Sequence, residues 1–166
     1  MADKTLDDLF HDTLRDIYYA ERKILKTLPK MARGAQSEEL KQAFLTHRDE
    51  TEGQIERLQQ VFEIIGKRPR AKTCDAIEGI VSEGEEILDE FKGTAALDAG
   101  LLAVAQAVEH YEISRYGSLR SWAEELGMKD AAKLLQETLD EESKTDELLT
   151  KLAKTTINLA AQKKAA

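Results

Sequence analysis

The sequence lacks most of the features that stabilise a protein by means other than a helical core. Its 166 residues include one cysteine, Cys74, so the chain can form neither an intramolecular disulfide nor a metal site built from several thiolates. It has only two prolines and nine glycines, and no useful stretch shows the alternation of apolar and polar residues that is typical of strands. These absences exclude a disulfide-stapled fold and argue against a β-sheet fold.

Long apolar runs and basic clusters are also missing. No segment approaches the roughly 20 apolar residues that a membrane span requires, and the N-terminal MADKTLDDLF is acidic where a signal peptide needs a basic region. Acidic residues number 32 against 24 basic ones, which gives a formal net charge of -8, and the basic residues are scattered. We therefore expect a cytoplasmic protein with no membrane and no nucleic acid as partners.

What the sequence has in abundance is the composition of long helices. Charged residues make up 34% and hydrophobic residues 42% of the chain. Apolar residues recur three and four positions apart, the spacing of one helix face. This periodicity predicts helices over about residues 5–32, 37–66, 74–91, 96–126 and 129–159, followed by a frayed AAQKKAA tail.

The connections between these helices indicate how they are arranged. Short turns at Gly34 and Gly127 predict two antiparallel hairpins, and the long basic link around Pro69, together with the third helix, allows a crossover between them. Ser37 is expected to cap the second helix, and Thr94 or Asp98 the fourth. We predict an all-α fold in a single domain over residues 1–166: a ferritin-like four-helix bundle with an additional short helix in the crossover, five helices in all.

Polar residues interrupt the apolar faces of the four long helices. In the first helix, Glu21 lies in line with Ile17, Ile24 and Leu28, one turn from its apolar neighbours. The corresponding faces of the other long helices carry the polar residues His47, Glu50 or Thr51, and Gln54; Glu109, Glu112 and Tyr116; and Thr138, Glu142 and Asp146.

The distances of these polar residues from the hairpin turns predict that they lie at the same level of the bundle. If the first hairpin folds about position 35, Glu21 faces position 49; if the second folds about Gly127, Glu112 faces position 143 and Glu109 faces Asp146. Both acidic layers then lie about 14 to 16 residues from their turns, roughly 21 to 24 Å along each helix. The two layers are expected to coincide in the centre of the bundle.

Several ionised carboxylates in an apolar interior need protons, cations or a metal, because each loses its hydration and repels its neighbours. Oxygen ligands with an imidazole, supplied by four helices, are typical of a di-iron or di-manganese site. The candidate metal ligands are Glu21, His47, Glu50, Glu109, Glu112, Glu142 and Asp146.

Four stretches carry a resemblance to a known family. The segments YAERKILKTLPKMA, HRDETEGQIERLQQVFEIIGKRP, AVEHYEISRYGSLRSWAEELG and LLQETLDEESKTDELLTKLA are similar to the YciF/YciE family of ferritin-like bacterial stress proteins, over essentially the whole chain. The resemblance implies a fold related to rubrerythrins and ferritins, dimer formation and a di-metal centre. It also implies that the metal ligands are Glu21, Glu50, Glu109, Glu112 and Glu142.

The chain departs from the ligand pattern of di-iron bundles at two positions. Such bundles usually have Glu-x-x-His on their second and last long helices, but Gly53 follows Glu50 and Thr145 follows Glu142 at that spacing. His47 and Asp146, each one turn from the respective glutamate, are the substitutes available. The resemblance therefore does not imply ferroxidase or peroxidase activity for this chain.

Two hypotheses remain open at the level of sequence. The first is a metal-binding stress protein that handles iron or reactive oxygen. The second is a non-catalytic structural or interaction bundle that has lost the metal site, with its acids held by protons or by bases such as Arg22, Arg48 or Arg115. In either case the family and the apolar residues Leu101, Leu102 and Val104 favour a homodimer.

Overall fold

Helix α1 (Leu6–Gly34) begins at a capping box. The Thr5 hydroxyl accepts a hydrogen bond from the backbone N–H of Asp8 at 3.2 Å, and the Asp8 carboxylate accepts one from the backbone N–H of Thr5 at 2.9 Å. These bonds satisfy donors that the first turn of a helix leaves free. Because Pro29 lies inside α1 and has no N–H, one backbone bond of the helix is missing there.

The computed structural model describes residues 3–162, and the predicted helices are confirmed within this range. The last helix continues beyond its α-helical part through a π-helical turn, and the final residues of the predicted tail, 163–166, lie outside the described residues. The elements after α1 are α2 (Glu38–Ile64), α3 (Asp75–Glu90), α4 (Leu97–Glu125), α5 (Lys129–Leu152), the π-helical turn η1 (Ala153–Ile157) and α6 (Asn158–Ala161).

The helix ends follow local chemistry in most places. The Ser37 hydroxyl accepts a hydrogen bond from the backbone N–H of Leu40, which confirms Ser37 as the N-cap of α2. Gly127 follows the end of α4 with a φ of 71°, in the left-handed region that favours glycine. The N-cap predicted for α4 was wrong, because Ala96 occupies this position and makes no side-chain cap.

Asp98 instead stabilises the turn between α1 and α2. Its two carboxylate oxygens accept hydrogen bonds from the backbone N–H groups of Gln36 and Ser37 at 2.8 and 2.7 Å. This turn lies against the start of α4, so its free N–H groups are available to the carboxylate. The contact joins the first hairpin to the second.

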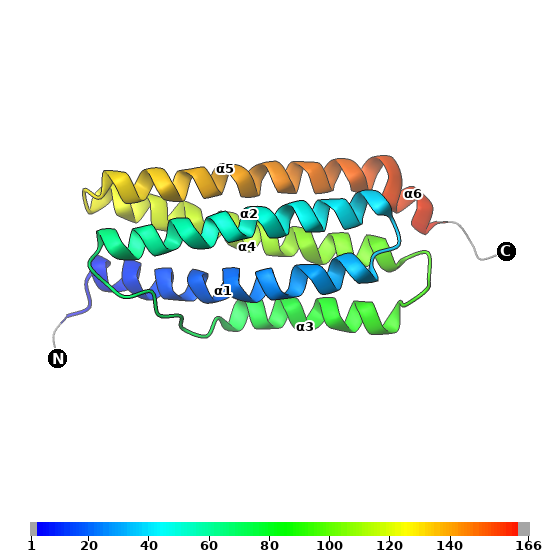
Figure 1. The fold of residues 1–166 in the computed structure, drawn as a ribbon, viewed down its shortest axis with the longest axis horizontal. Coiled ribbons are helices and arrows are strands. Elements are labelled where there is room, and N and C mark those ends of the chain that lie inside the picture. Colours follow the sequence, from blue (N-terminus) through cyan, green and yellow to red (C-terminus); the bar gives the residue numbers. More distant parts are fainter. Residues whose placement is uncertain (1–2, 163–166) are drawn as a thin grey trace.

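The four long helices form a ring in which α1 packs on α2 and α4, while α5 packs on α4 and α2. The connection after α2 runs back along the bundle through α3, which lies against α1 and α4 on the outside of the ring (Figure 1). Helices α2 and α4 consequently run in the same direction. None of the helices among residues 3–162 combines the length and apolarity needed to cross a membrane.

Helix α3 lies so close to α4 that only small residues fit at two contacts. A Cβ added at Gly84 would lie 3.1 Å from Cγ1 of Val104, and one added at Gly100 would lie 2.8 Å from Cγ2 of Ile87. The α4 residues Leu101, Leu102 and Val104 are consequently buried within the chain, with 0%, 2% and 7% of their surface exposed. The expectation that these residues are left over for a dimer interface was therefore wrong.

Candidate metal centre

Five ionisable side chains from four helices are buried in the middle of the bundle. They are Glu21 of α1, His47 of α2, Glu109 and Glu112 of α4, and Glu142 of α5, and none is more than 4% exposed. Glu109 and Glu112 share one face of α4 because residues three apart are neighbours on a helix surface. The polar interruptions of the apolar faces thus converge inside the bundle.

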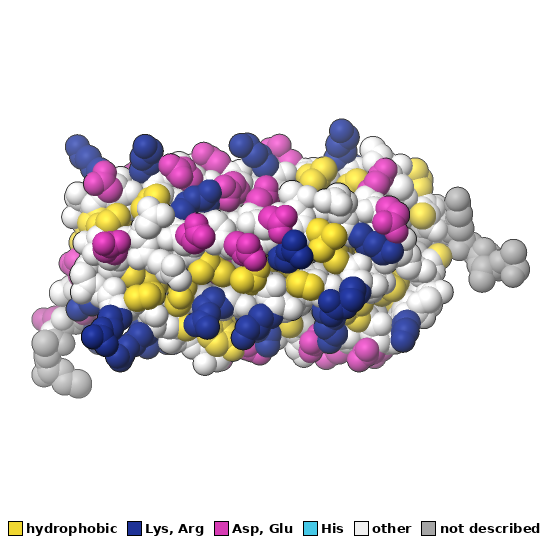
Figure 2. Space-filling view, viewed as in Figure 1, with side chains coloured by type: hydrophobic (Ala, Val, Ile, Leu, Met, Phe, Trp, Pro, Cys, Tyr) yellow, Lys and Arg dark blue, Asp and Glu magenta, His cyan; other side chains and the backbone are white. Residues whose placement is uncertain are grey.

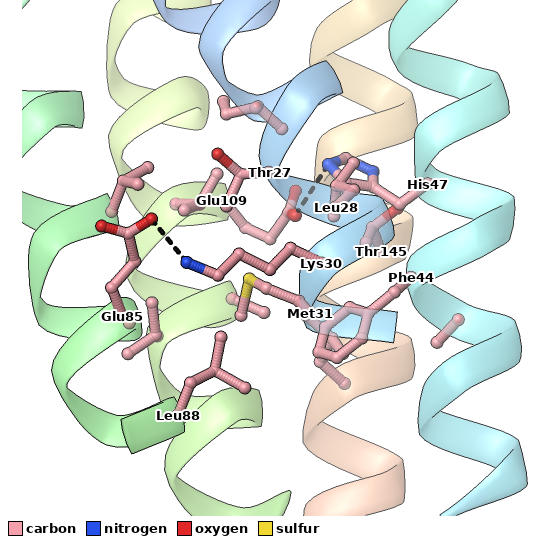
Figure 3. Close-up of a pocket in the computed structure, with 18 residues that line it drawn as sticks. Thr27, Leu28, Lys30, Met31, Phe44, His47, Glu85, Leu88, Glu109 and Thr145 are labelled. Carbon is pink, nitrogen blue, oxygen red and sulfur yellow. Dashed lines mark hydrogen bonds and ion pairs between the residues drawn. The ribbon is translucent and has the colours of Figure 1, made fainter. Parts of the chain in front are cut away.

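Four of these side chains come close enough to share a metal ion. One ligand atom from each of His47, Glu109, Glu112 and Glu142 lies within 4.8 Å of the others. His47 Nε2 lies 3.2 Å from Glu109 Oε1, the contact marked between these residues in Figure 3. Since ligands at about 2.1 Å from an ion are at most about 4.2 Å apart, this set is only slightly wider than one coordination sphere.

The fifth side chain, Glu21, is held by a tyrosine. The buried hydroxyl of Tyr116 donates a hydrogen bond to Glu21 Oε1 at 2.5 Å. The amide of Gln54 in α2 donates across the bundle to Glu142 of α5 and also to Glu141, the latter at 3.1 Å. Both Tyr116 and Gln54 occupy positions in the polar interruptions, but their role as partners of the glutamates was not predicted.

Many polar atoms of the five side chains have no partner. Glu21, Glu109 and Glu142 each have one buried carboxylate oxygen without a hydrogen bond among the described residues, as do both carboxylate oxygens of Glu112. Both ring nitrogens of His47 likewise make no hydrogen bond there, and their contacts are the ion-pair approaches to Glu109 at 3.2 Å and to Glu50 at 3.7 Å. A buried polar atom without a partner is costly, so such atoms are rare in folded proteins. Oxygen and imidazole donors left free around one point fit a divalent metal ion.

The pKa values of the clustered side chains also favour a divalent cation at this point. Burial and the charge of Glu142 raise the pKa of Glu21 to about 8. Burial and the neighbouring carboxylates also raise the pKa values of Glu109 and Glu112 well above their ordinary range. Burial lowers the pKa of His47, but Glu50, Glu142 and Glu21 outweigh it and raise the pKa overall. Without a cation, the centre therefore retains protons at neutral pH.

The structure places Glu50 at the edge of the centre. Its side chain is 37% exposed, and its Oε2 lies 3.7 Å from His47 Nδ1. The same oxygen accepts a hydrogen bond from the Thr145 hydroxyl at 3.4 Å. Glu50 thus contacts His47 from the solvent side and does not join the four clustered ligand atoms.

Asp146 does not pair with Glu109. Its carboxylate is engaged nearer the surface by His110 Nε2 and by the amide of Gln106, each at 3.2 Å. His47 of α2 occupies the place opposite Glu109, because the bundle interior brings α2 against the second hairpin. Asp146 lies at the predicted level, because Gln106 and His110 flank Glu109 along α4, but its hydrogen bonds are with these two residues, and the contact of His110 with Asp146 was not predicted.

The arginines considered as partners for the acids are engaged elsewhere. Arg48 pairs with its neighbour Asp49, with 2.6 Å between Nη2 and Oδ1. The guanidinium groups of Arg22 and Arg115 lie over the rings of Tyr18 and Tyr111, 5.6 and 5.2 Å from the ring centroids. None of these three contacts reaches the buried carboxylates, so the centre is not neutralised by these bases.

An all-α bundle with a crossover helix and a central cluster of glutamates and one histidine, supplied by four helices, is typical of the ferritin-like class of proteins. Within this class, the chain belongs to the family described as Domain of unknown function (DUF892), whose model matches residues 5–162. The resemblance to YciF-type proteins is thereby confirmed.

Known relatives match almost the entire chain. Protein YciF of Escherichia coli (strain K12) is 45% identical over 163 residues, which cover 98% of each protein. The crystal structure of this E. coli stress protein has a TM-score of 0.89 and covers 94% of this chain and 99% of its own. YcfI of Rhodopseudomonas palustris, provisionally described as a structural protein, is 47% identical with a TM-score of 0.86, over 89% of this chain and 94% of its own.

A more distant structure shares the fold. A protein from Xanthomonas campestris pv. campestris is 22% identical with a TM-score of 0.72, and the match covers 93% of this chain and 94% of that one. At this identity the likeness concerns the arrangement of the helices alone.

Proposed function

We propose that this chain is a metal-binding stress protein whose bundle centre holds two divalent iron or manganese ions and takes part in handling iron or reactive oxygen. The observation that carries the proposal is the convergence of His47, Glu109, Glu112 and Glu142 within 4.8 Å, together with the unpartnered atoms of these buried side chains. The E. coli relative, whose structure covers 94% of this chain, is described as a stress protein.

The charge of the centre favours two ions over one. Glu21, Glu109, Glu112 and Glu142 are buried and carry four negative charges once deprotonated. One divalent ion would leave two of these charges uncompensated in a region of low dielectric, whereas two ions would neutralise them. His47 then contributes a neutral imidazole ligand that adds no charge.

The surrounding residues position the ligands. Glu50 lies close to His47 Nδ1, and a carboxylate there favours the tautomer with the proton on Nδ1, which leaves Nε2 free to ligate. Tyr116 and Gln54 orient Glu21 and Glu142 through their hydrogen bonds. Bound iron or manganese would supply charge stabilisation and redox capacity at this centre. Asp146 and Glu50 remain candidates for ligands that join after small side-chain movements.

The proposal is tested by measuring the metal content. Protein expressed in medium rich in iron or manganese and purified without chelator should contain about two equivalents per chain by elemental analysis. The double variant Glu112→Gln, Glu142→Gln should lose most of this metal, whereas Glu124→Gln, an exposed position of the same helix α4, should keep it. Less than a tenth of an equivalent in the wild type, on the order of adventitious binding, would overturn the proposal.

A second candidate function is a structural or interaction bundle without metal. The hydrogen bond from Gln54 to Glu142 favours it, since an amide donor already satisfies one oxygen of a proposed ligand. The missing Glu-x-x-His pattern and the description of the R. palustris relative as a structural protein point the same way. In this case the raised pKa values would keep the acids protonated in the working protein.

Thermal denaturation discriminates between the two candidates. A metal that binds only the folded state stabilises it by an amount that grows with the logarithm of its concentration over Kd, and so raises the melting temperature. We expect Mn²⁺ to raise the melting temperature of the wild type and to leave that of Glu142→Ala unchanged. Indifference of the wild type to both Mn²⁺ and anaerobic Fe²⁺ would favour the structural bundle.

A homodimer remains part of the proposal. Helix α1 carries the exposed bases Arg22, Lys26, Lys30 and Arg33, while α2 carries the exposed acids Glu52, Glu56 and Glu63. Figure 2 shows basic side chains gathered along the lower side of this face and acidic ones above them, with apolar side chains between. Two copies related by a two-fold axis would bring opposite charges together, which light scattering at low and high salt would test. The cytoplasmic location and the single domain over residues 1–166 stay predictions.

A further inference from the structure

A small cavity adjoins the candidate metal centre. It has a volume of about 30 Å³, and residues of α1, α2, α3, α4 and α5 line it. Eleven of its eighteen lining residues have apolar side chains, among them Met31, Phe44, Val104, Val108 and Leu149. His47 and Glu109, which belong to the metal centre, also line this cavity (Figure 3).

The other end of the cavity is lined by residues at the surface between α1 and α3. Lys30 of α1 and Glu85 of α3 line it there, and each side chain is 51% exposed. Their ion pair, with 2.9 Å between Nζ and Oε1, lies across the cavity in the view of Figure 3. The cavity thus extends from this ion pair, past apolar side chains of α3 and α4, to the ligands of the metal centre.

Size and polarity restrict what can occupy this space. A cavity of about 30 Å³ exceeds the roughly 10 to 15 Å³ that one water molecule needs, but a buried water also needs two to four polar partners. The apolar middle of the cavity, around Val104, Ala105 and Val108, offers no side-chain partner. Small apolar molecules meet no such penalty there, whereas peroxide would lose its hydrogen bonds with water.

We propose that this cavity is a binding site for dioxygen and the route by which dioxygen reaches the metal centre. Dioxygen is a small apolar molecule, and mostly apolar side chains line the cavity between the Lys30–Glu85 ion pair and the metal-centre residues His47 and Glu109. The inference rests on the proposed function, because bound dioxygen has a role at this site only if metal ions occupy the centre. It selects dioxygen over peroxide as the oxygen species that uses this entrance.

Xenon is a suitable probe for the cavity, because it is apolar, binds dry cavities and requires no metal. In metal-free protein under xenon pressure, the methyl resonances of Val104, Val108 and Leu149 should shift in a saturable manner. Shifts that are absent or linear in pressure would overturn the proposal. This measurement does not depend on whether the centre binds metal.

Variants of residues in and outside the cavity test whether xenon binds there. Ala105→Leu places a larger side chain in the cavity and should weaken xenon binding at least tenfold. Ala107→Leu makes the same change at an exposed position of α4 and should leave binding as in the wild type. Val108→Ala enlarges the cavity and should strengthen binding severalfold, so the proposal stays testable even if Ala105→Leu fails to fold. Equal binding by all these proteins would overturn the assignment.

A last measurement tests whether the cavity adjoins the metal ions. Bound ¹²⁹Xe should relax much faster in protein loaded with paramagnetic Mn²⁺ than in protein loaded with diamagnetic Zn²⁺. Mn²⁺ that binds at the expected stoichiometry without this effect would refute the route to the centre, although the metal site itself would stand. Saturable xenon binding with no bound Mn²⁺ would instead refute the proposed function, and with it the role assigned to the cavity.

Discussion

Replacing Glu21 by glutamine should stabilise the metal-free protein at neutral pH. Glu21 is fully buried, and its pKa is raised to about 8 from an ordinary value of 4.5. A group whose pKa is raised by folding contributes stability below its unfolded pKa and loses it as the pH rises toward its folded pKa. Between about pH 4.5 and 8 the unfolded chain ionises at this position while the folded protein retains the proton, so the metal-free wild type progressively loses stability.

The size of the effect follows from the shift. One group contributes about 1.4 kcal/mol per pH unit within this window, so at pH 7 the folded state has lost about 3 kcal/mol through Glu21. Glutamine cannot ionise, yet its carbonyl oxygen can still accept the hydrogen bond that Tyr116 donates. Glu21→Gln should thus be about 3 kcal/mol more stable than the wild type at pH 7, equivalent to roughly 6 to 12 °C in melting temperature for a domain of this size.

The assay is urea denaturation of chelator-treated protein, followed by circular dichroism at several pH values between 4.5 and 8.5. The free energies of unfolding should agree at pH 4.5 and diverge as the pH rises. Glu124→Gln, at an exposed position of α4, should follow the wild type throughout. Parallel curves for Glu21→Gln and the wild type would refute the reasoning, because Glu21 would then be ionised at no cost. A gain in stability accompanied by loss of metal binding would show that the centre is maintained at the expense of stability.

Three further predictions concern the metal centre and the turn between α1 and α2. Binding of Mn²⁺ at pH 7 should release protons, because burial and neighbouring charges raise the pKa values of Glu21, Glu109 and Glu112; titration calorimetry in buffers of different ionisation enthalpy measures this release, and identical heats in all buffers would contradict it. Tyr116→Phe removes the donor to Glu21 and should cost about 1 to 3 kcal/mol of unfolding free energy in the metal-free protein, as measured by urea denaturation; an unchanged midpoint would show that the bond is dispensable. Asp98→Ala removes the acceptor of two backbone N–H groups in the turn between α1 and α2 and should lower the free energy of unfolding by about 3 kcal/mol. Asp98→Asn keeps one acceptor oxygen and should lower it less. Equal melting temperatures for the wild type and both variants would count against this role of Asp98.

The sequence predicts the helices and the convergence of the acids because both depend on periodicity along one chain. Glu21, Glu112 and Glu142 replace apolar residues on faces that must be buried, and the turns at Gly34 and Gly127 fix their common height. The same reasoning cannot settle contacts between hairpins. Facing positions within a hairpin place Asp146 at the level of Glu109, but the side chain that contacts the Glu109 carboxylate is His47 of α2, which the second hairpin meets only in the folded bundle.

Two other differences have the same origin. Asp98 has the composition and position of an N-cap for α4, yet it binds the turn of the other hairpin, more than 60 residues away in sequence. Leu101, Leu102 and Val104 extend the apolar surface of α4 beyond what one bundle face requires, and the placement of α3 buries them. In each case the local pattern identifies a residue that needs a partner, and only the tertiary arrangement selects which partner it finds.

The division of the centre between two hairpins has a consequence for how the protein holds together. Helices α1 and α2 supply Glu21 and His47, while α4 and α5 supply Glu109, Glu112 and Glu142. Neither half carries a complete set of ligands, so a chain cleaved in the linker of residues 66–73 would yield two fragments that need each other to bind an ion. Metal bound at the centre would then hold the two fragments together, since its ligands come from both of them.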